Sequence, residues 1–196
     1  MDVWKLPKSV KVNGKEYRIR SDYRAVLDIL CAINDPDIVA GMSEEEKNLE
    51  IYTTILAIFY EDFDNLPIED WEEALKTAKE FIDCGFKGDK KKPQLMDWKK
   101  DAKILIPAIN KVAHEDIRDK EYLHWWTFMG LFMEIGESLF STITNIREKV
   151  SKGKKLDSWE KEFYSSNKEL VDLKATPERS EEEKEELRRV FGLVNN

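Results

Sequence analysis

Residues 43–63 read SEEEKNLEIYTTILAIFYEDF, and this stretch decides the fold class. Ser43 followed three positions later by Glu46 is a capping box, which satisfies the first backbone N–H groups of a helix. At about 100° per residue, the apolar side chains of that helix cover more than half of its circumference. They are Leu49, Ile51, Tyr52, Ile55, Leu56, Ile58, Phe59 and Phe63. The stretch therefore predicts a mainly α protein with this helix at its centre.

The sequence on either side of this stretch also has helical patterns. Ser21 or Asp22 can cap a helix that ends before Pro36, because the residue before a proline avoids the α conformation. Leu66-Pro67 begins another helix, which Gly85 ends. Its predicted apolar face consists of Trp71, Leu75, Ala78 and Ile82.

Helical patterns continue through the middle of the chain. A helix is predicted from Trp98 to about Ala113, with Asp97 as its cap and a bend at Pro107. Residues 123–150 are predicted to be helical with a kink at Gly136, and the first half is apolar almost all round. Such a helix belongs inside a bundle, so we expect a multi-helix bundle.

The N-terminal residues, from about 6 to 20, predict a β-hairpin. Apolar and polar residues alternate over 10–12 and 17–19, on either side of Asn13-Gly14. This pair most readily takes the positive φ angles of a type I′ turn. Two strands alone are marginal in water. The hairpin must therefore pack on the helices, which we favour, or extend a sheet in a partner.

The character of the sequence changes after Lys152-Gly153-Lys154. Residues 1–152 form the predicted helical domain, and residues 153–196 form a charged helical segment with few apolar anchors. Because this segment gains little from burial, we expect it to be docked weakly or ordered by a partner.

Composition and motifs narrow the classes of function. A net charge of −8 at pH 7 disfavours binding to nucleic acid or to an anionic membrane. The sequence lacks the pattern of a signal peptide and an uninterrupted membrane-length apolar stretch, so a cytoplasmic location is expected. His114 and His124 lack zinc-site spacing, and we find no phosphate loop or nucleophile elbow. We therefore predict a protein that is not an enzyme and uses no metal or other cofactor.

One basic run lies near the end of the predicted 139–150 helix. Cations at the C-terminal end of a helix stabilise it by a few tenths of a kcal/mol, and Glu160 and Glu162 are close enough in sequence to pair with them. We favour this structural role over a nucleic-acid site. The run consists of Arg147, Lys149, Lys152, Lys154 and Lys155.

Trp125-Trp126 is the most specific local feature of the chain. Two adjacent side chains on a helix cannot share one direction. Burial of both indoles against different neighbours is slightly favoured, while a groove or subunit contact for one of them stays open, as does a homo-oligomer. The candidate partner-binding residues are Trp125, Trp126, Phe128, Trp159 and Phe163.

Several of these features, taken in order, resemble one known family. They are the Leu6-Pro7 and Asn13-Gly14 hairpin, the 97–108 helix, the Leu123-His124-Trp125-Trp126-x-Phe128 segment, and Ile146-Arg147 with the Lys-Gly-Lys and Leu156 that follow. The chain is similar to the small helical protein of long-tailed phages and prophages of Gram-positive bacteria, the gene product fifteen family. The His-Trp-Trp segment is the distinctive part.

The resemblance implies a function that the residues alone do not give. The family is typically encoded between the tail-tube and tape-measure proteins, which implies a tail-assembly chaperone that binds the tape-measure protein or another tail protein in the host cytoplasm. No active-site residues come with the resemblance. The alternative is a structural minor tail or connector protein that is retained in the virion.

Overall fold

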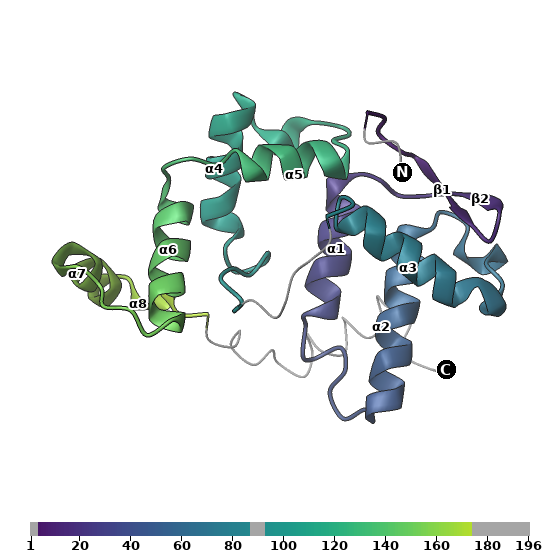
Figure 1. Ribbon diagram of the computed structural model, residues 1–196, viewed down its shortest axis with the longest axis horizontal. Coiled ribbons are helices and arrows are strands. Elements are labelled where there is room, and N and C mark those ends of the chain that lie inside the picture. The colour runs from purple at the N-terminus through teal and green to yellow at the C-terminus, as the bar shows by residue number, and fades with distance from the viewer. Residues whose placement is uncertain (1–3, 87–92, 174–196) are drawn as a thin grey trace. The chain divides into compact units, whose positions relative to one another are not determined.

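The computed structural model describes residues 4–86 and 93–173. Most of them are helical, and a two-stranded antiparallel hairpin lies near the N-terminus, so the predicted mainly α fold class is confirmed (Figure 1). The described residues fall into two units. The first comprises residues 4–86 and 122–129, and the second comprises residues 93–121 and 130–173.

Two helices of the first unit, α1 and α2, begin at predicted caps, whereas the helix predicted to begin at Leu66-Pro67 begins at Trp71. The Asp22 side chain accepts a hydrogen bond from the Arg24 backbone N–H, and Ser43 and Glu46 form the predicted capping box. In chain order its elements are β1 (Ser9–Val12), β2 (Lys15–Arg18), α1 (Tyr23–Ile33), α2 (Glu44–Phe59), α3 (Trp71–Ile82) and the first turns of α5 (Trp125–Met133).

The hairpin packs within its own unit, which confirms the favoured alternative. Val10, Val12, Tyr17 and Ile19 are buried. The end of β2 and the residues after it form backbone hydrogen bonds with the end of α2 and the residues that follow it. The Arg20 backbone N–H donates to the Phe59 carbonyl at 2.8 Å, and the Glu61 N–H donates to the Arg18 carbonyl at 3.1 Å. A small hairpin is thereby anchored on a helix end.

Two details of the first unit differ from the sequence prediction. The buried face of α3 consists of Ala74, Thr77, Ala78 and Phe81, so the helix is rotated by about one residue from the predicted face. Small residues allow a closer approach there, and Phe81 supplies the volume. The prediction that α2 is central is wrong for its N-terminal half, where Leu49 and Tyr52 are exposed.

The second unit is helical throughout its regular structure. Ile143, Ile146 and Val171 form its buried cluster, and Leu156, Phe163 and Leu170 pack against it. The chain from 156 to 171 is therefore docked on α6. The predicted boundary at residue 152 stays a prediction, and residues 174–196 of that segment lie outside the described residues. The elements of this unit are the last turns of α5, α4 (Ala102–Ala113), α6 (Leu139–Ser151), α7 (Ser158–Ser166) and α8 (Lys168–Val171).

Two helix boundaries in this unit also differ from the prediction. The helix predicted from Trp98 begins at Ala102, because Asp97 closes a separate turn by accepting hydrogen bonds from the Lys99 and Lys100 backbone N–H groups. The expected kink at Gly136 is a complete break between α5 and α6. Ser138 caps the new helix by accepting from the Ser141 N–H at 3.1 Å.

Candidate interaction site

The start of α5 is attached to the start of α1 by backbone pairing. The Tyr23 N–H donates to the Leu123 carbonyl at 2.9 Å, and the Trp125 N–H donates to the Ser21 carbonyl at 2.8 Å. The Asp22 carboxylate, which also caps α1, accepts from the Leu123 N–H at 2.9 Å. The position of the tryptophan pair is therefore set by residues about one hundred positions earlier in the chain.

Both indoles donate hydrogen bonds to carbonyls at the C-terminal end of α3. The Nε1–H of Trp125 donates to the Ile82 carbonyl at 2.8 Å, and the Nε1–H of Trp126 donates to the Phe81 carbonyl at 2.9 Å. The last carbonyls of a helix have no partner within it, so the bond from Trp125 satisfies the Ile82 carbonyl, while the bond from Trp126 adds to the one that the Phe81 carbonyl accepts from the Cys84 backbone N–H at 3.0 Å. The tryptophan pair thus acts as a side-chain cap of a neighbouring helix.

The aromatic rings around Trp125 form a stack. Trp125 lies against Phe128 with ring centroids 5.4 Å apart, and Phe128 lies against Tyr23 at 4.8 Å with the rings nearly parallel. Trp125 and Phe128 are buried, whereas Trp126 is half-buried. Of these three candidate partner-binding residues, only Trp126 reaches the surface of the described structure.

His124 is held in one neutral form between two backbone groups. Its Nδ1 accepts from the Trp126 backbone N–H at 3.0 Å, so the ring proton lies on Nε2, which donates to the Pro7 carbonyl at 3.0 Å. The side chain is buried. Burial lowers the pKa of His124 from its ordinary value, and the nearby Lys8 acts in the same direction, while the bond to Pro7 opposes them.

Acidification should therefore destabilise the first unit through His124. A histidine whose pKa is lowered by folding contributes stability that is fully present above its unfolded pKa of about 6.5 and is lost as the pH falls below it. We expect the urea concentration at the midpoint of unfolding of the wild type to decrease when the pH is lowered from about 7.5 to about 5. His124→Gln should show a weaker fall, and His114→Gln should behave as the wild type. Equal slopes for all three proteins would contradict this assignment.

The other two candidates, Trp159 and Phe163, lie on α7 in the second unit. Trp159 is 56% exposed, whereas Phe163 is half-buried against the Ile143 cluster. The helix is fixed by Glu160, which accepts from the Asp157 backbone N–H and from Lys149 Nζ at 2.7 Å. This ion pair confirms the structural role predicted for Lys149. Trp159 is therefore an exposed aromatic side chain on a well-anchored helix.

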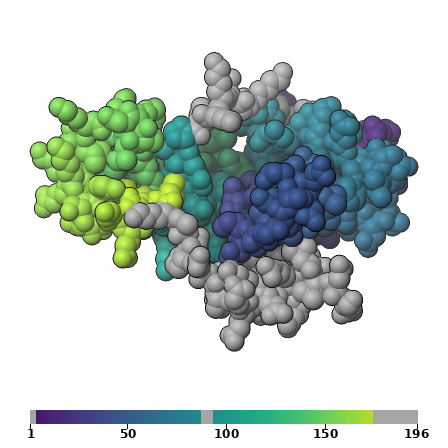
Figure 2. Space-filling view, turned by 90° about the horizontal axis from the view of Figure 1, so that it is seen from below, coloured from purple at the N-terminus to yellow at the C-terminus, as the bar shows by residue number. Residues whose placement is uncertain are grey.

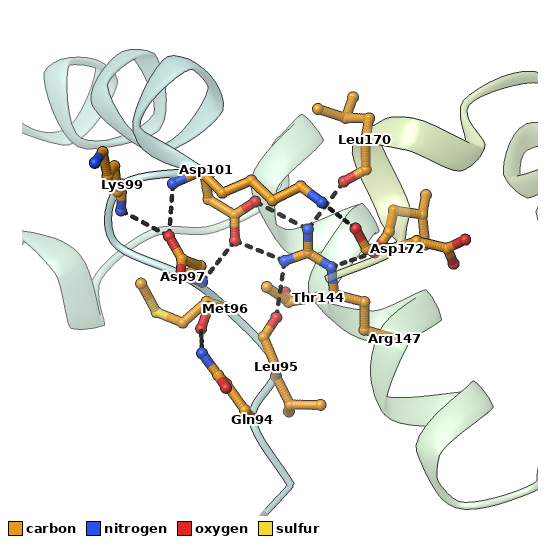
Figure 3. Close-up of polar contacts among 12 residues, drawn as sticks. Gln94, Leu95, Met96, Asp97, Lys99, Asp101, Thr144, Arg147, Leu170 and Asp172 are labelled. Atoms are coloured by element: carbon orange, nitrogen blue, oxygen red, sulfur yellow. Dashed lines mark hydrogen bonds and ion pairs between the residues drawn. The ribbon is translucent and has the colours of Figure 1, made fainter. Parts of the chain in front are cut away.

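Arg147 has a role that the sequence did not indicate (Figure 3). Its guanidinium is buried and pairs with the buried Asp101 carboxylate through two bonds of 2.6 and 2.9 Å. It also donates to the carbonyls of Leu95, Leu170 and Val171. We call these five residues the Arg147 clasp. The clasp joins α6 to the turn before α4 and to the last described helix, α8.

No group of three or more His, Cys, Asp or Glu within 4–86 and 93–173 is placed to hold a metal ion. Burial raises the pKa of the Cys84 thiol to about 11, so little nucleophilic thiolate forms at neutral pH. Within the same residues, no helix is both long and apolar enough to cross a membrane.

One departure from ordinary packing is on α2. Leu49, Tyr52, Leu56 and Phe59 are spaced by three, four and three residues, so they line one side of the helix, and we call them the α2 stripe. Leu56 and Phe59 are fully buried, but Leu49 is 58% exposed and Tyr52 is 45% exposed. The core-facing side of α2 thus continues for two turns beyond the core that covers it. This end of the helix lies at the molecular surface, in dark blue in Figure 2.

Comparison with known proteins places these features in a family context. The model of the family described as Bacteriophage Gp15 protein matches residues 3–173. No curated protein and no solved structure matches the chain. The matched residues span both units, so they include the attachment of α5, the Arg147 clasp and the α2 stripe.

Proposed function

This chain belongs to the bacteriophage Gp15 protein family, and on that premise we propose that it is a tail-assembly chaperone that binds the tape-measure protein. The observation that carries the proposal is the α2 stripe, where two large apolar side chains on the core-facing side of a helix are exposed. A tape-measure protein is a long helical chain, and helical segments of this kind bury apolar stripes against other helices. The proposed role is non-catalytic and belongs to the host cytoplasm.

The charge of the protein supports such a role. A chaperone must cover apolar surface reversibly and keep the complex in solution until the tube closes around the tape-measure protein. A net charge of −8 keeps a chain of 196 residues away from the neutral state that promotes precipitation. The exposed part of the α2 stripe consists of only two side chains, and a small apolar contact favours release over permanent assembly.

Co-expression with the tape-measure protein of the same phage tests the proposal. Affinity purification through either protein is expected to recover both, and the tape-measure protein is expected to be more soluble when this chain is present. A folded chain that fails to copurify with several tape-measure fragments would count against the proposal. Purified virions should lack the protein when they are analysed by mass spectrometry. Its presence in fixed copy number would instead favour a minor tail or connector protein.

A further inference from the structure

The α2 stripe changes its surroundings along the length of the helix. Toward the C-terminus Leu56 and Phe59 lie in the core, and the Phe59 ring contacts Phe81 of α3 with centroids 5.2 Å apart. Toward the N-terminus Leu49 and Tyr52 continue the same spacing without cover. A spacing of three and four residues is the one by which apolar side chains of one helix insert between those of another. The exposed half therefore has the geometry of an open helix–helix seam.

Charges around the exposed half restrict what can pack there. The seven residues from Glu44 to Glu50 include four glutamates and one lysine, Lys47, which pairs with Glu44 at 2.9 Å. The Ser43 backbone N–H holds the pKa of Glu46 below its usual range, so this carboxylate stays ionised. The seam is thus apolar at Leu49 and Tyr52 and acidic at its N-terminal end.

We infer that the exposed half of the α2 stripe, Leu49 and Tyr52 with the glutamates of the first turns, is the docking face for a basic amphipathic helix of the partner. Lysine or arginine beside an apolar stripe would neutralise the acidic border, and an acidic or neutral helix would not. The inference rests on the proposed function when it identifies that partner as a segment of the tape-measure protein.

A second copy of this chain fits the face poorly. The C-terminal half of the stripe is buried in its own unit, so two copies could overlap only through their N-terminal turns. Each copy would bring its own Glu44, Glu45 and Glu46 to that overlap, so two acidic surfaces would meet, which is unfavourable. Charge therefore selects a basic partner over self-association.

A pair of synthetic helices tests the face directly. Both peptides are about three heptads long and have leucine at the a and d positions. One peptide, the lysine peptide, has lysine at the e and g positions, and the other has glutamate there. Fluorescence anisotropy with the full-length protein should show saturable binding of the lysine peptide and no binding of the glutamate peptide. Leu49→Asp should weaken that binding by about tenfold or more, because a carboxylate would enter an apolar seam. Leu49→Gln should weaken it less, and Leu49→Met should retain it.

The matched control is Val150→Asp, which adds the same charge at an exposed helical position in the second unit. Nonspecific attraction of the lysine peptide would be strengthened by either aspartate, so a loss seen only at Leu49 identifies the face. Equal binding to the wild type and to Leu49→Asp would overturn the inference. A dimer of the wild type in light scattering that becomes a monomer in Leu49→Asp would also overturn the inference, because a second copy would then cover the face.

The same variants separate this inference from the proposed function. If the tape-measure protein copurifies with the wild type and equally with Leu49→Asp, the docking face is wrong and the chaperone role stands. If no tape-measure fragment copurifies while the lysine peptide binds through Leu49, the face stands and its assignment to the tape-measure protein is wrong.

Discussion

Replacement of Arg147 by methionine is expected to lower the free energy of unfolding of the second unit by about 3–5 kcal/mol. The substitution leaves the fully buried Asp101 carboxylate without its ion-pair partner. It also removes the donors to the Leu95, Leu170 and Val171 carbonyls, and each buried acceptor left without a donor adds to the loss. Urea denaturation followed by circular dichroism measures the change, and hydrogen exchange should localise it to α4, α6 and α8.

A double variant distinguishes the buried charge from the lost packing. In Asp101→Asn with Arg147→Met no charge is left buried, so part of the lost stability should return. Lys152→Met is the matched control, because Lys152, the C-cap residue of α6, pairs with Glu148 near the solvent, and its loss should change stability far less than the loss of Arg147. If Arg147→Met were no more harmful than Lys152→Met, the clasp would not hold the unit together.

Replacement of Trp125 by alanine is expected to destabilise the first unit by about 3–5 kcal/mol. The change creates a cavity beside Phe128 and Tyr23, and it removes the donor to the Ile82 carbonyl. Urea denaturation gives the magnitude, and hydrogen exchange should show the loss in α1 and α3.

The adjacent tryptophan is the natural comparison. Trp126→Ala removes a similar hydrogen bond, to Phe81, but from a half-buried side chain, so about 1–2 kcal/mol is expected. Equal losses from the two substitutions would mean that burial does not distinguish the two indoles. Neither tryptophan belongs to the docking face, so binding to the tape-measure protein is tested separately from these two substitutions.

The parts of the fold that the sequence predicted are those with local signals. Asn13-Gly14 sets the hairpin turn through the backbone angles of two residues, and Ser43 with Glu46 begins α2 through bonds that span three positions. Asp22 is a similar case. Each signal operates within one turn of the chain, so nothing distant can remove it.

The parts that it missed depend on distant residues. Arg147 looked like a helix-end cation because nothing near it in the sequence reveals Asp101, which lies 46 positions earlier. The predicted start of the helix at Trp98 is a local exception, because Asp97 closes its own turn by accepting from the backbone N–H groups two and three positions later. The tryptophan pair illustrates the same limit, since its donors serve carbonyls of α3 more than forty positions away. The apolar pattern of α2 predicted how much of its surface is apolar. Only the tertiary structure shows that the core covers Leu56 and Phe59 but leaves Leu49 and Tyr52 exposed.

The attachment of α5 to α1 has a consequence for the order of synthesis. Asp22 bonds to Leu123, 101 positions later, so the first unit lacks its closing piece until the ribosome has passed that point. At about 5–20 residues per second, the chain between α3 and Trp125 takes roughly 2 to 8 s to make. During that interval the Ile82 carbonyl of α3 lacks its donor from Trp125, and the ring of Tyr23 lacks its contact with Phe128. A nascent chain of this protein therefore exposes apolar surface of its own until the start of α5 has been made.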